Sequence, residues 1–295
     1  MLKSIPVNTR TYQTIPTRVS ETDFNAFILP HLGKKTKGPK PKISYFKLFN
    51  YVMWILYTGA QWKSLQDVIK EDKSGKAEIH YSTVFRHFQY WCSDGSFCRL
   101  FEDSVVQLHR RGKIDWSVLY GDGTTTIAKK GGDNLGFSGH KHFKGEKIVA
   151  FCDNNRNIVA PFVTAAGNRN ESPLFPQSFE HVQRIAKLVG ADIAGSTISL
   201  DGAYDSKKNR KKIFNAKMIP NIPYNKRNRK KEKPGPKRIY DPGIQANRFN
   251  TIGIAFAWED KFRRLQIRYE RKSQNHFGFK LIAYAMLNFR NLNFL

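Results

Sequence analysis

The sequence predicts an α/β protein in which a helical amino-terminal region precedes a mixed α/β domain. Two patterns predict this class. Between residues 44 and 110, apolar residues recur at steps of three and four, the spacing of helices with one buried face. From residue 115 on, short apolar runs bounded by turn residues come first and then alternate with helical stretches, as in a sheet-based domain. We therefore divide the chain into residues 1–112 and 113–295.

The amino-terminal region is predicted to contain three helices. The first starts near residue 44 and ends at Thr58-Gly59, the second is short and covers residues 64–71, and the third is capped by Ser82. Arg86 and His87 are expected on the outer side of the third helix. A short helix, a turn and a helix with a basic outer face is the layout of a helix-turn-helix that enters the DNA major groove. An ordinary helical bundle fits the pattern equally well, and the net charge favours DNA.

In the second region, the order of the predicted elements is strands first and then strands alternating with helices. The helices at its end carry an apolar stripe that we assign to the core. The predicted strands cover residues 116–120, 147–152, 158–165, 197–200 and 218–224, and the predicted helices cover 173–189, 206–217, 252–271 and 277–292. Asp205 or Ser206 is expected to cap the second of these helices.

The charge of the chain indicates a polyanionic partner. Lys and Arg number 50 against 24 Asp and Glu, which gives a formal net charge of +26. Three stretches rich in basic residues, Pro and Gly, at residues 33–42, 128–147 and 225–238, are either solvated loops or phosphate contacts. From the last stretch we expect four DNA contacts: Lys226, Arg227, Arg229 and Lys230.

Membranes and disulfides do not fit the sequence. The longest apolar stretch, residues 51–57, is far shorter than the roughly 20 residues that span a bilayer. The amino-terminal residues lack the apolar segment of a signal peptide. The three cysteines form no CxxC pair, which favours a reducing cytoplasm over a disulfide or zinc framework.

Two aspartates occupy equivalent places in the predicted sheet. Asp122 follows the run WSVLY by one residue, and Asp201 directly follows ISL. The carboxyl ends of strands are where ligands bind in open α/β sheets, and hard oxygen ligands favour Mg²⁺ or Mn²⁺. Each aspartate also fits an ordinary Asp-Gly turn. On a strongly basic chain, we expect the pair to lie close together and to bind metal.

The segments DGTTTIAKKGGDNLGFSGHKHFKGEK, SLDGAYDS and FAWEDKFRRLQIRYER resemble the DDE transposases of bacterial insertion sequences, and the resemblance spans about residues 40–292. It implies an RNase H-like catalytic domain, dependence on Mg²⁺ (or Mn²⁺), and cleavage and transfer of DNA strands. It makes Asp122 and Asp201 the first two catalytic, metal-binding residues. It places Arg264 and Arg268 on a basic carboxy-terminal helix that faces DNA phosphates.

One position departs from the family pattern. A glutamate usually precedes the FAW segment and completes the acidic triad, but the matching residue here is Gly253. Asp260 lies seven residues later, roughly 10 Å along a helix, and is a weak substitute. Glu259 would point about 120° away from that face, and we expect both to be exposed helix acids. Strand cleavage is therefore expected to be weak or absent in this copy.

The sequence thus predicts a transposase that binds insertion-sequence ends and target as double-stranded DNA, and that carries out Mg²⁺-dependent cleavage and transfer unless this copy is inactivated. A homo-oligomer in a synaptic complex, no membrane partner, and a bacterial cytoplasmic, nucleoid-associated location are expected. Two alternatives remain: a catalytically dead DNA-binding remnant, and an RNase H-like nuclease or resolvase. Metal-dependent cleavage separates the enzymes from the remnant, and joining of a 3′ end to target DNA separates a transposase from a nuclease.

Overall fold

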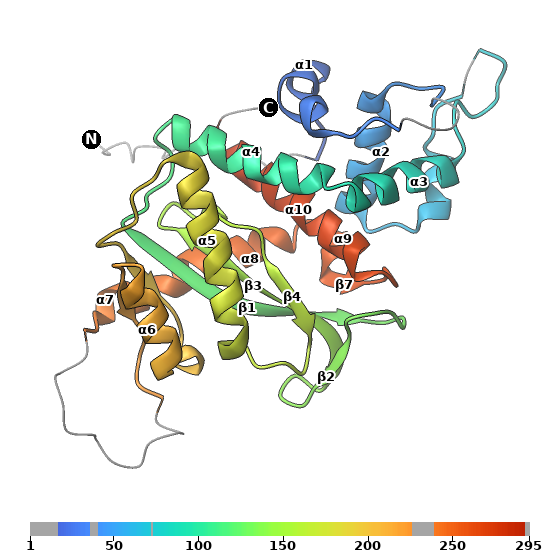
Figure 1. Cartoon of the computed structure of the whole chain (residues 1–295). Helices are drawn as coiled ribbons and strands as arrows, with labels where there is room; N and C mark the ends of the chain where they lie inside the picture. The colour runs from blue at the N-terminus through green and yellow to red at the C-terminus, as the bar shows by residue number, and fades with distance from the viewer. Residues whose placement is uncertain (1–16, 36–40, 72, 226–238, 293–295) are drawn as a thin grey trace, which may run out of the picture.

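The computed structural model describes residues 17–35, 41–71, 73–225 and 239–292. One mixed sheet lies below a group of helices in Figure 1, and helices from the second half of the chain cover both faces of the sheet. The mixed α/β class predicted from the sequence is confirmed. Within the described residues, no helix is long and apolar enough to cross a membrane.

The amino-terminal region is helical. Ser44 caps the helix α2 by accepting a hydrogen bond from the Lys47 N–H, and Gly59 ends that helix with φ 71°. The elements are α1 (Glu21–Asp23), η1 (Phe24–Ile28), η2 (Leu29–His31), α2 (Tyr45–Thr58), η3 (Trp62–Asp67), α3 (Tyr81–Ser93) and α4 (Ser96–Arg110).

The predicted short helix at residues 64–71 is a 3₁₀ helix, η3, and residues 68–80 separate it from α3. This connection is longer than the three- or four-residue turn of a helix-turn-helix. The helix-turn-helix assignment stays a prediction.

The sheet has the strand order of an RNase H-like fold. Strand β3 is antiparallel to β1, β2 and β4, whereas β5 and β6 run parallel to β1, in the order β2-β3-β1-β5-β6. Strand β7 pairs in parallel with the carboxyl-terminal end of β1. The strands are β1 (Val118–Ala128), β2 (Gly136–Ser138), β3 (Phe143–Asp153), β4 (Val163–Ala166), β5 (Thr197–Ser199), β6 (Ile219–Asn221) and β7 (Ile267–Arg268).

The helices of this part surround the sheet. Of the two predicted caps, Asp205 and Ser206, it is Ser206 that caps α6, by accepting from the Asn209 N–H. The elements are η4 (Ser172–Leu174), α5 (Phe175–Val189), η5 (Gly202–Tyr204), α6 (Lys207–Asn215), α7 (Pro242–Arg248), η7 (Phe249–Gly253), α8 (Ile254–Glu259), α9 (Arg263–Gln266) and α10 (Ser273–Arg290).

Neighbouring residues of β3 show which helix covers which face. The Phe151 ring contacts Phe175 of α5, whereas the next residue, Cys152, is within hydrogen-bonding reach of Thr251 in η7. Because successive side chains in a strand point to opposite faces, α5 and η7 lie on opposite sides of the sheet. The continuous helical segment formed by α7, η7 and α8 therefore crosses the face opposite α5.

Helix α10 joins the two predicted regions. It packs against both α3 and α4, and α4 and α10 lie side by side in Figure 1. A side chain at Gly278 would meet the Cys92 sulfur at 2.4 Å, so a glycine is needed for this close approach of α10 to α3. Asn288 donates hydrogen bonds to Ser104 in α4 and to the Ile158 carbonyl beside the sheet. One hydrophobic core thus runs through both regions, and a division at residue 112 remains a prediction.

Some element boundaries differ from those predicted. Strands β1 and β3 are longer than expected, and β2 lies inside the stretch predicted as a loop. The helix expected at residues 252–271 begins earlier, at Pro242, and is interrupted after Glu259. Arg264 is therefore in the short helix α9 and Arg268 is in strand β7, rather than on one long basic helix.

His87 belongs to this core and not to an outer, DNA-facing surface, because it is only 4% exposed and packs against Tyr45 and Trp91. The expectation that it lies on the outer side of the helix, where it would face DNA, is wrong. Helix α3 turns His87 toward the core along with Val84, Phe88 and Trp91, and leaves Arg86 exposed.

We expect His87 to make the fold sensitive to acid. Burial, reinforced by Lys35 and Arg86, lowers the pKa of His87 to about 4. Stability from the neutral imidazole is fully present above pH 6.5 and is lost as the pH falls toward 4, because the unfolded chain then binds the proton more tightly. Between pH 7 and pH 4.5, the free energy of unfolding should fall by about 2–3 kcal/mol more in the parent than in His87→Phe, as measured by urea denaturation. His140→Gln, at an exposed histidine, is the control; identical pH profiles for His87→Phe and the parent would contradict the prediction.

Candidate functional site

The parallel pairing of β1 with β5 places Asp122 and Asp201 on neighbouring strands. The last paired residues are Tyr120 and Ser199. Asp122 follows the first by two residues and Asp201 follows the second by two residues, so the aspartates occupy matching positions. Asp201 is also the N-cap of η5, where its Oδ1 accepts a hydrogen bond from the Ala203 N–H at 2.6 Å. Local strand ends and register therefore account for this pair.

Asp122 faces the helical segment that crosses the sheet opposite α5. Arg248, the last residue of α7, forms an ion pair with it, with Nη1 2.8 Å from the Asp122 Oδ2. Burial raises the pKa of Asp122 above its ordinary value; the positive charge of Arg248 acts in the opposite direction, and the negative charge of Glu171 adds to the rise. The nearest charged partner of the first predicted catalytic residue is thus a cation supplied by the chain itself.

Glu171 is a third carboxylate near the aspartates that the sequence did not reveal. Its carboxyl carbon lies 2.3 Å from the place where a side chain on Gly123 would begin, so that Glu171 packs directly against the Gly123 backbone. Since Asp122 and Gly123 point to opposite faces of β1, Glu171 approaches β1 from the face opposite Arg248. Glu171 pairs with Lys147, with Nζ 3.0 Å from Oε1, and accepts a hydrogen bond from the Tyr204 hydroxyl.

A cavity of about 520 Å³ lies next to Asp201. Glu171, Lys147 and Asp205 also line it, so it contains acidic side chains and at least one cation. Burial, and then the charges of Glu171 and Asp122, raises the pKa of the neighbouring Tyr204 well above its usual range. The carboxylates therefore lie close enough to influence one phenol. Across the part of the chain that the structure describes, however, no three His, Cys, Asp or Glu side chains are grouped so that they could hold a metal ion.

The substitute candidates for the third acid lie elsewhere. Glu259 is buried and not exposed as expected; it forms an ion pair with Lys280 and accepts a hydrogen bond from the Tyr284 hydroxyl, both in α10. Asp260 is the C-cap of α8, and burial and the adjacent Glu259 raise its pKa. Gly253 lies at the end of η7 inside a longer helical segment, where an added side chain would meet only the exposed Phe249 ring, at 3.5 Å.

Arg264 and Arg268 are buried and paired within the chain, which corrects the expectation that both lie on a helix facing DNA phosphates. Arg264 is 5% exposed, pairs with Glu270 and donates to the Ala60 carbonyl. Arg268 is 1% exposed and pairs with Glu146 and Asp133. Each guanidinium compensates a buried carboxylate and holds separate segments together. Lys226, Arg227, Arg229 and Lys230 lie outside the described residues.

A basic and aromatic groove lies beside Arg264. This cavity of about 570 Å³ is bordered by exposed Lys63 and Lys130 and by the rings of Trp62, Tyr81 and Tyr269. Lys63 and Tyr81 come from the amino-terminal region, whereas Lys130 and Tyr269 flank β1 and β7. Neither lysine was singled out from the sequence, because only the packing of the two regions brings them together.

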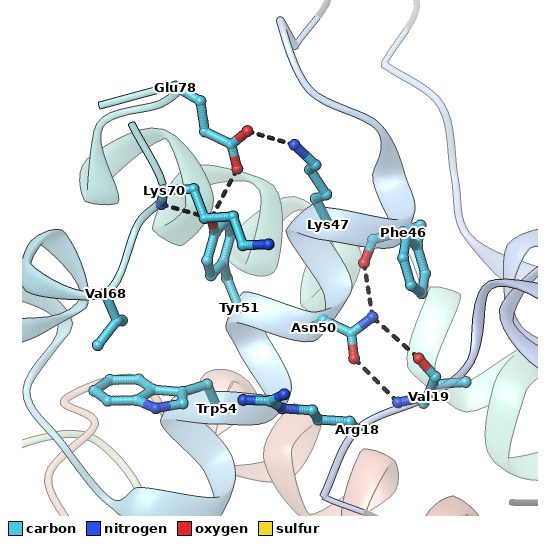
Figure 2. Close-up of a pocket in the computed structure, with 10 residues that line it drawn as sticks. All are labelled: Arg18, Val19, Phe46, Lys47, Asn50, Tyr51, Trp54, Val68, Lys70 and Glu78. Carbon is cyan, nitrogen blue, oxygen red and sulfur yellow. Dashed lines mark hydrogen bonds and ion pairs between the residues drawn. The ribbon is translucent and has the colours of Figure 1, made fainter. Parts of the chain in front are cut away.

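A second basic hollow, of about 410 Å³, lies against α2 (Figure 2). Its polar groups are largely paired with one another: Lys47 forms an ion pair with Glu78, and the Tyr51 hydroxyl donates to the same carboxylate at 2.7 Å. Burial raises the pKa of Tyr51 to about 12. Arg18 and Lys70 add positive charge at the edge. This hollow shares no residue with the carboxylate cluster.

Comparison with known proteins gives one family and several solved structures. The family described as transposase DDE domain matches residues 107–287. The piggyBac transposase synaptic complex with hairpin DNA is 13% identical, with 95% of this chain and 72% of that chain covered and a TM-score of 0.48. The pre-cleavage Mos1 transpososome is 10% identical, with 88% and 80% covered and a TM-score of 0.28. No curated protein matches.

A third structure, the Mos1 transposase paired-end complex with left transposon end, is 9% identical with a TM-score of 0.27. The match covers 64% of the present chain and 61% of the Mos1 chain.

Proposed function

Because this chain belongs to the transposase DDE domain family, which matches more than half of it, we propose that it binds the ends of a bacterial insertion sequence and cleaves them weakly or not at all. The sequence resemblance is the reason for proposing insertion-sequence ends as the DNA. The ion pair at Asp122 and the glycine at position 253 are the reasons for proposing weak cleavage. A homo-oligomer that holds two DNA ends, acting at the nucleoid in the cytoplasm, is part of this proposal.

One observation carries the proposal: the helical segment α7–η7–α8, which follows β6 in the chain, places a cation, and no acid, beside Asp122. DDE transposases use divalent metal ions, and in the family this segment supplies the third carboxylate. Here Gly253 contributes no ligand, and Arg248 pairs with Asp122 at 2.8 Å. Asp201 and Glu171 are engaged by a backbone N–H and by Lys147. The residues do not fit a Mg²⁺ or Mn²⁺ site of the family's kind.

The charge of the protein supports DNA binding independently of the carboxylates. The net charge is +26, and the groove between the two regions combines two exposed lysines with three aromatic rings. Lysines bind phosphates as point charges, and aromatic faces suit bases or sugars. Arg86, exposed on α3, stays the predicted contact in the major groove.

We expect duplex DNA binding by the full chain to weaken steeply with salt, because bound phosphates release counterions. The double substitution Lys63→Ala/Lys130→Ala should lower the slope of log affinity against log salt by about 2, roughly 0.9 for each phosphate that the variant no longer binds. Fluorescence anisotropy between 50 and 200 mM salt measures this. The double substitution Lys187→Ala/Lys208→Ala, at exposed lysines of α5 and α6, is the charge-matched control. An equal change in both proteins would remove the groove from the DNA surface, and affinity independent of salt would contradict the proposed function.

A further inference from the structure

We infer that Arg248 is the resident cation of the carboxylate site: it neutralises Asp122 and excludes a divalent metal ion from that residue. This inference deepens the proposed function, because it gives the reason for weak cleavage and implies that DNA binding needs no metal. It concerns a side chain that the family pattern does not predict, and it rests on contacts within this chain.

The first support is the position of Arg248 in the fold. Three residues on the same helical segment bind one side of the neighbouring strands β5 and β1: Gln245 accepts from Ser199, Asn247 donates to Tyr120, and Arg248 pairs with Asp122. The segment is thus fixed across β5 and β1 by direct hydrogen bonds. Arg248 is held over Asp122 by this docking and does not reach it from a mobile loop.

The second support is the burial of the pair. The side chains of Arg248 and Asp122 are 19% and 26% exposed, so much of the attraction between them is shielded from water. A metal ion at Asp122 would have to displace this guanidinium or lie beside it. Two positive charges near one carboxylate repel each other, and loss of the pair would leave Arg248 without the carboxylate that compensates its charge.

The third support is the shape of the helix. Residues Phe249–Gly253 form a π-helical turn directly after Arg248. Such a turn closes hydrogen bonds between residues five apart, so Gly253 lies about one turn beyond Arg248 along the segment. The residue that reaches Asp122 is Arg248, and the position expected to carry a glutamate supplies no charge. The segment therefore presents a base, and no acid, to Asp122.

Mn²⁺ binding to the full chain tests the inference without an activity assay. We expect Arg248→Gln to bind Mn²⁺ at least about tenfold more tightly than the parent, as measured by the electron paramagnetic resonance signal of free Mn²⁺. The gain should vanish when Asp122→Asn is added. Arg248→Lys should behave like the parent, because it keeps the positive charge. Arg184→Gln, which removes a more exposed ion pair with Glu102 at 2.6 Å, is the control and should gain no affinity.

Thermal unfolding keeps the test valid if Arg248→Gln is poorly folded at room temperature. Mn²⁺ should then raise the melting temperature of Arg248→Gln and leave that of the parent unchanged, because a ligand stabilises only the state that binds it. Asp122-dependent Mn²⁺ binding by the parent, as tight as in Arg248→Gln, would overturn the inference. DNA affinity measured without metal on the same proteins separates the two proposals, since its absence would contradict DNA binding and leave the role of Arg248 standing.

Discussion

Replacing Gly253 by glutamate and Arg248 by glutamine in the same chain is expected to produce Mg²⁺-dependent DNA nicking on the order of 100-fold above that of the parent. The double change restores the missing acid and removes the cation that pairs with Asp122. A side chain at 253 meets only the exposed Phe249 ring, so the glutamate fits without disturbing the core. Removing a helical glycine should also add about 0.5–1 kcal/mol to the stability. The nicking is measured as the rate at which a supercoiled plasmid carrying the flanking DNA of the gene becomes open-circular.

Gly253→Glu alone should give a much smaller gain, because Arg248 is then able to pair with the new carboxylate. The triple variant with Asp122→Asn serves as the control and should nick no faster than the parent. Parent protein that already nicks as fast as the double variant would show that neither residue limits cleavage. In that case Asp260, which burial and Glu259 give a raised pKa, becomes the residue to replace next.

Arg268→Leu is expected to lower the free energy of unfolding by about 3–5 kcal/mol, which is the usual effect of leaving one member of a buried ion pair without its partner. The residue left behind is Glu146, whose side chain is 1% exposed and 3.0 Å from the Arg268 Nη1. Burial raises the pKa of Glu146 even with Arg268 in place. Urea denaturation followed by circular dichroism measures the loss.

The double variant Arg268→Leu/Glu146→Leu separates a structural role from a DNA-binding role. Because it removes both charges, it should recover most of the stability and keep the DNA affinity of the parent. If the double variant is as stable as the parent but binds DNA much more weakly, Arg268 contacts phosphates and its burial in the free protein is not the whole of its role. Arg263→Leu, at an exposed arginine in the adjacent short helix α9, is the comparison.

The sequence predicted those parts of the fold that depend on neighbouring residues. Helix α2 was found from its apolar spacing and its end at Gly59, and α6 from its Ser206 cap. The helix predicted at residues 252–271 was wrong in its limits, because an amphipathic stripe does not reveal the break after Glu259. Strand β7 was missed because two residues pairing with the far end of β1 leave no local pattern.

The site was predicted only in part, for a related reason. Asp122 and Asp201 were found because each follows an apolar strand, which is a local signal. Arg248 was missed because its partner lies far away along the chain, and pairing across a sheet is set by the docking of whole elements. The same limit explains Arg264, whose charge indicated DNA whereas its contacts with Glu270 and a distant carbonyl give it a structural role. A count of basic residues cannot distinguish a charge on the surface from a buried charge that is paired with a carboxylate.

The packing of α10 against α3 and α4 also governs the order in which the protein can mature on the ribosome. Helices α2 to α4 leave the exit tunnel long before Ser273–Arg290 is synthesised, yet they share with it Asn288, which bonds Ser104, and the close approach at Gly278. We therefore expect the apolar face of the nascent amino-terminal helices to stay uncovered until α10 has been synthesised. Exposed apolar faces of this kind are what chaperones bind.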